Sequence, residues 1–154
     1  MKRATHYTEQ RKKLDALFED IRKFKCDEEI SSILSKHLCI LVSGYIENSI
    51  RDIIYDYTKN KSNENVANFV EAKLKRLGNP KIEPILQLVG SFNSQWRDSI
   101  EQQLDEELKD AVNSIVRNRN QIAHGVDVGI TFGQIYAYYE KSNEVIKIIE
   151  KQCC

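Results

Sequence analysis

The scarcity of helix-breaking residues constrains the fold of this chain most. Its 154 residues include only two prolines and six glycines, so few positions interrupt a helix. Apolar residues recur at spacings of three and four over most of the length, and no segment shows the alternation of a half-buried strand. We therefore expect an all-α fold, an antiparallel bundle of four main helices plus short helices. The length fits a single domain over residues 1–154.

The apolar spacing also predicts where the helices begin and end. The second helix carries Ile30 and Ile33 at the start of its apolar stripe and is apolar on most sides over 38–46, so it should be the central, most buried helix. Residues 90–96 are predicted to be irregular, and Thr131-x-x-Gln134 has the form of a capping box that opens the last helix. The predicted ranges are about 6–24, 27–59, 62–77 with Ser62 as the cap, 82–89, 98–124 and 131 onward.

Composition limits the class of protein. Apolar residues make up 41% of the chain and charged residues 30%, with a formal net charge of zero. This composition is that of a folded globular protein and not of a general polyanion binder. The charge is uneven, because residues 1–81 hold sixteen Lys/Arg and twelve Asp/Glu, whereas residues 82–154 hold seven and eleven. A local basic face would have to come from folding.

Cysteine usage and hydropathy point to a cytoplasmic protein without a metal or other cofactor. The four cysteines, Cys26, Cys39, Cys153 and Cys154, form no C-x-x-C pair and have no histidine at finger-like spacing. The polar start of the chain does not resemble a signal peptide. No apolar run approaches the ~18 residues that a membrane span needs. We expect no membrane association.

The stretch 117–125, Arg-Asn-Arg-Asn-Gln-Ile-Ala-His-Gly, is the most informative for function. Arg119 falls where the next apolar residue of the helical stripe should follow Ile115. A cation on a core-facing seam is costly unless it is paired, and Glu47 in the central helix is a candidate partner. An arginine and a histidine held together suit phosphodiester chemistry, in which one clamps the phosphate and the other moves protons.

The helix geometry limits how these side chains can cooperate. Arg117, Asn120 and His124 share one helix face, whereas Arg119 and His124 point ~140° apart on a regular helix. One helix therefore cannot focus Arg119 and His124 on one phosphate. Either the helix ends at His124, before Gly125, and frees the imidazole, or a second copy of the helix faces the first across a two-fold axis.

Several residues carry a resemblance to a known family. Arg119-Asn120-x-Ile122-Ala123-His124-Gly125 is similar to the R-x(4–6)-H motif of HEPN domains, and the whole chain resembles the RiboL-PSP-HEPN type. The motif falls at the end of the penultimate helix of an all-α bundle. Further features that carry the resemblance are Gly44-Tyr45-Ile46-Glu47, the Asn79-Pro80 break, Trp96, the turn Gly129-Ile130-Thr131 and the following Tyr136, Tyr138 and Tyr139.

The resemblance implies a dimer whose motifs face each other and, in active members, metal-independent endoribonuclease activity, often in toxin–antitoxin or anti-phage systems. Arg119 matches the motif arginine, Asn120 the polar residue after it, and His124 the histidine. Arg117 satisfies the motif with six intervening residues, so the identity of the arginine stays open. Arg117 and Asn118 are candidate substrate contacts.

The expected function is that of a homodimeric endoribonuclease of a defence system, with RNA as substrate and a cognate antitoxin or defence protein as partner. In this chemistry the RNA supplies its own 2′-hydroxyl as nucleophile, and imidazole exchanges protons near neutral pH. A non-catalytic HEPN module that binds RNA, a nucleotide or a protein is the alternative. A third interpretation is a helical adaptor, in which Arg119 is structural and His124 stabilises a helix C-terminus.

Overall fold

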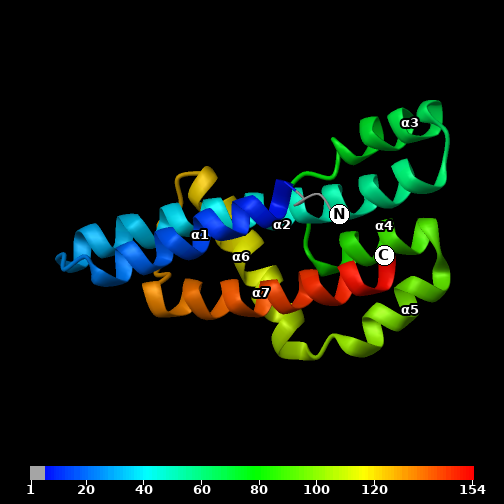
Figure 1. Cartoon of the computed structure of the whole chain (residues 1–154). Coiled ribbons are helices and arrows are strands. Elements are labelled where there is room, and N and C mark those ends of the chain that lie inside the picture. Colours follow the sequence, from blue (N-terminus) through cyan, green and yellow to red (C-terminus); the bar gives the residue numbers. More distant parts are fainter. Residues whose placement is uncertain (1–5) are drawn as a thin grey trace.

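The computed structural model describes residues 6–154 and contains seven helices and no strand in that range (Figure 1). Four helices are long and three are short, which confirms the predicted all-α bundle. None of the helices in this part of the chain combines the length and apolarity needed to cross a membrane. The helices are α1 (His6–Lys23), α2 (Glu28–Lys61), α3 (Glu64–Leu74), α4 (Ile82–Phe92), α5 (Ser94–Gln103), α6 (Glu106–Ala123) and α7 (Phe132–Cys153).

Helix α2 forms the centre of the molecule, as its apolar middle predicts. Its 34 residues give a length of ~51 Å, and the side chain of Asp27 caps its start by accepting a hydrogen bond from the Ile30 amide at 2.9 Å. Helices α1, α6 and α7 pack along it, and α3 packs beside its C-terminal half (Figure 1). Core residues such as Leu38, Val42 and Ile50 on α2 are fully buried.

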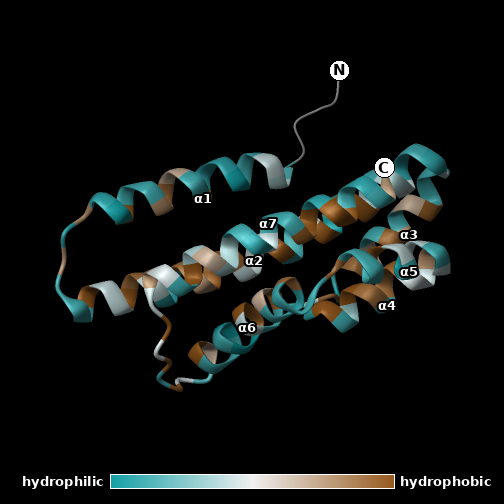
Figure 2. Cartoon of the chain, turned by 90° about the horizontal axis from the view of Figure 1, so that it is seen from below, coloured by the Kyte–Doolittle hydropathy of each residue, from teal (hydrophilic) through white to brown (hydrophobic). Residues whose placement is uncertain are grey.

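Helix α1 packs on the bundle through three buried side chains, those of Tyr7, Leu14 and Phe18. In Figure 2, α1 is mostly hydrophilic, whereas hydrophobic residues are concentrated along α2 and α7. Phe18 is buried and stacks on Tyr139 of α7 with ring centroids 4.7 Å apart; it also meets the edge of Tyr136 at 5.5 Å. This cluster closes one side of the core with rings that bury a large apolar area.

The helix predicted over 98–124 is wrong in its first part, because the structure divides that range into α5 and α6. Leu104 is extended but remains buried, and the Asp105 carboxylate accepts a hydrogen bond from the Leu108 amide at 2.8 Å. Aspartate favours such N-caps over helix interiors. The spacing of the apolar residues gives no sign of the break, because Ile100 before the break and Leu108 after it are both buried.

Two smaller boundaries also differ from the prediction. Residues 90–96 are helical apart from Asn93, which caps α5 by accepting from the Gln95 amide at 2.9 Å, and the Phe92 side chain stays exposed. Asn63 caps α3, whereas the Ser62 hydroxyl turns back and donates to the Thr58 carbonyl at 2.7 Å. The Thr131–Gln134 capping box is confirmed, with both of its hydrogen bonds present.

Candidate functional site

A glycine turn ends α6 at the histidine of the motif. His124 is the C-cap, and Gly125 adopts a left-handed φ of 74°. The Gly125 amide donates to the Ile122 carbonyl at 3.1 Å and the Val126 amide donates to the Gln121 carbonyl at 2.9 Å. This pair of bonds defines a Schellman motif, which satisfies the last carbonyls of a helix. The expected helix end is therefore confirmed, and His124 lies at the tip.

Arg119 lies on the side of α6 that faces α2, as the spacing of the apolar residues in α6 indicates. Its backbone adjoins the Cys39 thiol, which donates to the Ile115 carbonyl at 3.5 Å. Burial raises the pKa of Cys39 to about 12, and the Arg119 backbone opposes the rise. The Arg119 side chain is half-buried, and its Nη1 donates to Asn120 Oδ1 at 3.4 Å.

The predicted pairing of Glu47 with Arg119 is wrong within this chain. Glu47 Oε1 lies 2.5 Å from Nη2 of Arg51, one helical turn further along α2. Arg51 also donates to the Leu74 carbonyl at 3.0 Å, so the pair fastens the end of α3 to α2. Arg119 has no ion pair in the described part of the chain. Its charge is therefore available to an external anion or to a second copy.

The remaining motif residues lie on more exposed parts of α6. Arg117, Asn120 and His124 are exposed, and the side chains of Arg117 and His124 make no hydrogen bond or ion pair within residues 6–154. The Asn118 amide donates to the Ser114 carbonyl at 2.8 Å, so its donor is used within its own helix. Because α6 is regular up to Ala123, Arg119 and His124 stay on different faces of one chain.

An ion pair that the sequence does not indicate holds the loop after the motif. Lys36 Nζ on α2 lies 2.6 Å from Asp127 Oδ1. The hydrogen bond and the charge of Lys36 lower the pKa of Asp127 below its ordinary value of 3.8. The two residues are 91 positions apart in the chain, so no local spacing pattern reveals them. The pair places the His124 tip beside the N-terminal half of α2.

Four exposed apolar side chains lie on the N-terminal half of α2 and in the loop after the motif, which the Lys36–Asp127 pair joins, and we call them the apolar stripe. They are Ile30, Ile33 and Ile40 on α2 and Val126 after the motif, with exposed fractions of 43%, 59%, 40% and 50%. Ile30 and Ile33 were expected in the core, and the structure corrects this expectation. Since α2 is apolar around most of its circumference, periodicity alone could not show which side stays uncovered.

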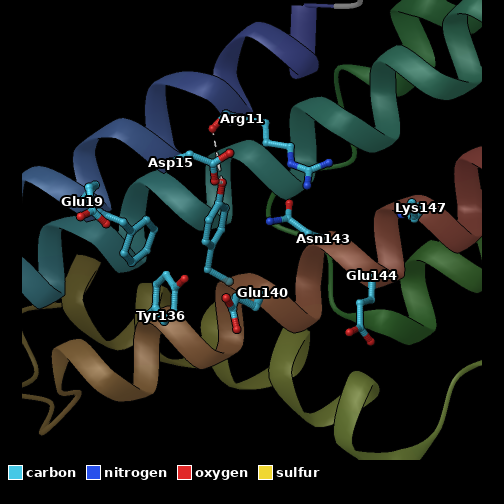
Figure 3. A pocket seen from close by; sticks show the side chains of 10 residues that line it. Arg11, Asp15, Glu19, Tyr136, Glu140, Asn143, Glu144 and Lys147 are labelled. Carbon is cyan, nitrogen blue, oxygen red and sulfur yellow. Dashed lines mark hydrogen bonds between the residues drawn. The ribbon is translucent and has the colours of Figure 1, made fainter. Parts of the chain in front are cut away.

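A cleft lies elsewhere, between α1 and α7 (Figure 3). It encloses about 570 Å³, and no predicted site residue lines it. The Tyr139 hydroxyl donates to Asp15 Oδ1 at 2.5 Å, and the Tyr45 hydroxyl donates to Asn143 Oδ1 at 2.8 Å. Burial raises the pKa of Tyr139, and the hydrogen bond to Asp15 adds to the rise. The two tyrosine hydroxyls therefore have hydrogen-bond partners within the protein. None of the residues 117–125 lines the cleft.

Among residues 6–154 no group of three or more His, Cys, Asp or Glu side chains is placed to hold a metal ion. An all-α bundle with an arginine and a histidine at a helix end is the arrangement that the resemblance to HEPN domains implies. The model of the RiboL-PSP-HEPN family matches residues 5–154, and the chain therefore belongs to that family. Neither curated proteins nor solved structures gave a match. HEPN domains are often ribonucleases, so at a coarse level this protein is an RNA-related module.

Proposed function

We propose that the protein is a metal-independent endoribonuclease that acts as a homodimer in a prokaryotic toxin–antitoxin or anti-phage defence system. One observation carries the proposal: a chain of the RiboL-PSP-HEPN family presents the motif residue His124 exposed and unpaired at the tip of α6. A cognate antitoxin or another defence protein would be the partner that restrains it.

Dimerisation is supported by what surrounds the tip. The apolar stripe leaves four large side chains in water next to the motif, and clustered exposed apolar groups of this kind mark protein contacts. A two-fold axis through the stripe would bring two copies of the α6 tip together. Arg119 of one copy and His124 of the other could then act on one phosphate, which the ~140° separation on a single helix prevents.

The proposed chemistry uses only groups of the RNA and the two protomers. One His124 imidazole accepts the proton of a ribose 2′-hydroxyl, whose oxygen attacks the adjacent phosphorus. The bond to the 5′-oxygen breaks, and that oxygen takes a proton from the other imidazole. The products are a 2′,3′-cyclic phosphate and a 5′-hydroxyl. Arg119 neutralises the charge that develops on the phosphoryl oxygens, and Asn120 orients the Arg119 guanidinium through its amide oxygen.

The proposal is tested by RNA cleavage in the presence of EDTA. We expect the wild type to cut a single-stranded RNA and His124→Ala to lose at least ~100-fold in rate, the lower range for a proton-transfer residue. His6→Ala, at the far end of α1, is the matched control and should retain full activity. Comparing Arg119→Ala with Arg117→Ala identifies the motif arginine.

The dimer is tested by analytical ultracentrifugation. Ile33→Asp with Ile40→Asp should convert a dimer into a folded monomer that no longer cleaves RNA, because the variant places two charges in the apolar stripe. A wild type that is monomeric and does not cut RNA would refute the proposal.

A non-catalytic module that binds RNA, a nucleotide or a protein is the second candidate. The observation that favours it is the separation of Arg119 and His124 on different faces of one chain. A wild-type dimer that binds RNA without cleaving it, with wild-type binding by His124→Ala, would support this candidate.

A further inference from the structure

The connection between α3 and α4 is fastened along α2 and does not project into solvent (Figure 1). Arg51 on α2 donates from Nε to the Leu74 carbonyl at 3.0 Å and from Nη2 to the Lys75 carbonyl at 3.1 Å. Two turns nearer the start of α2, the Ser43 hydroxyl donates to Asn79 Oδ1 at 3.0 Å. The connection therefore runs from the end of α3 back toward the half of α2 that faces the motif.

The same connection ends on α6, on the face that carries the motif histidine. The Ile82 amide donates to Asn113 Oδ1 at 2.9 Å, which places residue 81 against the middle of α6. Asn113, Arg117, Asn120 and His124 follow one another at helical spacings of four, three and four and share one face. The end of the connection thus meets α6 on the face that also carries His124.

The connection and this face of α6 carry four cations that form no ion pair within the described residues. Lys75, Arg76, Lys81 and Arg117 are all exposed. We call these four residues the basic track. Asp110, seven residues before Arg117, lies where the same face of α6 becomes acidic beyond the track.

The length of the track suits a nucleic acid strand. Two residues of α2 hold the ends of the track: Arg51 binds the Lys75 carbonyl, and Lys36 pairs with Asp127 in the loop after the His124 tip. They are fifteen residues apart on α2, or ~22 Å of helix. Single-strand binding grooves engage roughly 4–16 nucleotides. The zero net charge of the chain does not oppose this, because phosphate binding depends on local cations.

We propose that the basic track binds the phosphate backbone of single-stranded RNA and leads the strand to His124. This inference rests on the proposed function for its choice of RNA, and it adds the route by which the substrate reaches the tip. The contacts are ionic and go to phosphates, so the track positions the strand without reading its sequence. Long substrates gain affinity from it, and substrates too short to reach residues 75–81 do not.

Binding is tested with a fluorescein-labelled single-stranded DNA of twenty nucleotides, which has the same phosphates and no 2′-hydroxyl to be cut. The test variant is Lys75→Gln with Arg76→Gln and Lys81→Gln. The control is Lys12→Gln with Lys13→Gln and Lys151→Gln, which removes the same charge from exposed sites elsewhere. Each lost phosphate contact makes the negative slope of log K against log salt concentration shallower by ~0.7. The loss of three contacts corresponds to roughly 10- to 100-fold weaker binding at 0.1 M salt.

We expect the test variant to show this loss while the control stays within about 2-fold of the wild type. Equal binding by the two triple variants would overturn the track. RNA cleavage separates the two proposals. If the wild type cuts a twenty-nucleotide RNA and the test variant cuts it equally well, the track is wrong and the nuclease stands. If nothing is cut but the test variant alone loses binding, the track stands and the nuclease is wrong.

Discussion

Replacing Gly125 with alanine tests the turn that places His124 at the tip of α6. Gly125 has a φ of 74°, and no heavy atom lies within 4 Å of the position that a Cβ would take. Alanine would therefore meet no clash, and the whole cost is that of holding an L-residue in the left-handed region, about 1–2 kcal/mol. For a chain of this size, each kcal/mol lowers the Tm by roughly 2–4 °C, so the expected fall is about 2–8 °C.

Gly133→Ala is the matched control for this prediction. Gly133 lies in the first turn of α7, has no left-handed φ, and also has no heavy atom within 4 Å of a Cβ. Alanine there should raise the free energy of unfolding by up to about 0.5–1 kcal/mol, because glycine is the poorer helix former. The same chemical change thus has opposite expected signs eight residues apart. Thermal unfolding followed by circular dichroism measures both variants.

A Gly125→Ala protein as stable as the wild type would refute the Schellman turn and with it the place of His124. If the turn is correct, the proposed nuclease function predicts a second effect of Gly125→Ala. At a temperature where Gly125→Ala is fully folded, its RNA cleavage should fall more than that of Gly133→Ala, because the imidazole is carried by the altered turn.

Two further predictions concern thiol reactivity and the loop after the motif. Cys39 is buried and its pKa is raised to about 12, whereas Cys154 is exposed; at pH 8, iodoacetamide should alkylate Cys154 rapidly and Cys39 only after unfolding, as mass spectrometry would show. The Asp127 carboxylate should titrate below 3.8 by NMR, because Lys36 lowers its pKa in the folded state. The stability that its ion pair with Lys36 contributes is therefore fully present above the ordinary pKa of aspartate and is lost as the pH falls through the lower pKa of the folded state. In Lys36→Met the midpoint should return upward, and an unchanged midpoint would contradict the ion pair.

Part of the candidate site could be predicted because its signals are local. Gly125 marks the end of a helix without reference to any other element, and Arg119 follows Ile115 by four residues on the stripe. The structure agrees with the predicted end of α6 and with the place of Arg119 on the side that faces α2. The predicted partner of Glu47 is wrong, because Arg51 lies one turn away on the same helix and pairs with the carboxylate.

The sequence by itself determined the helical class, most helix ranges, the Thr131 capping box and the motif that indicates the HEPN family. Periodicity, caps, turns and short motifs depend on residues a few positions apart. Tertiary structure alone decided which side of α2 stays uncovered at Ile33, that Lys36 meets Asp127, and that Ile82 meets Asn113 one helical turn before Arg117. These outcomes depend on contacts between segments tens of residues apart, where many pairings share the same local pattern and only the packing of the whole bundle selects one.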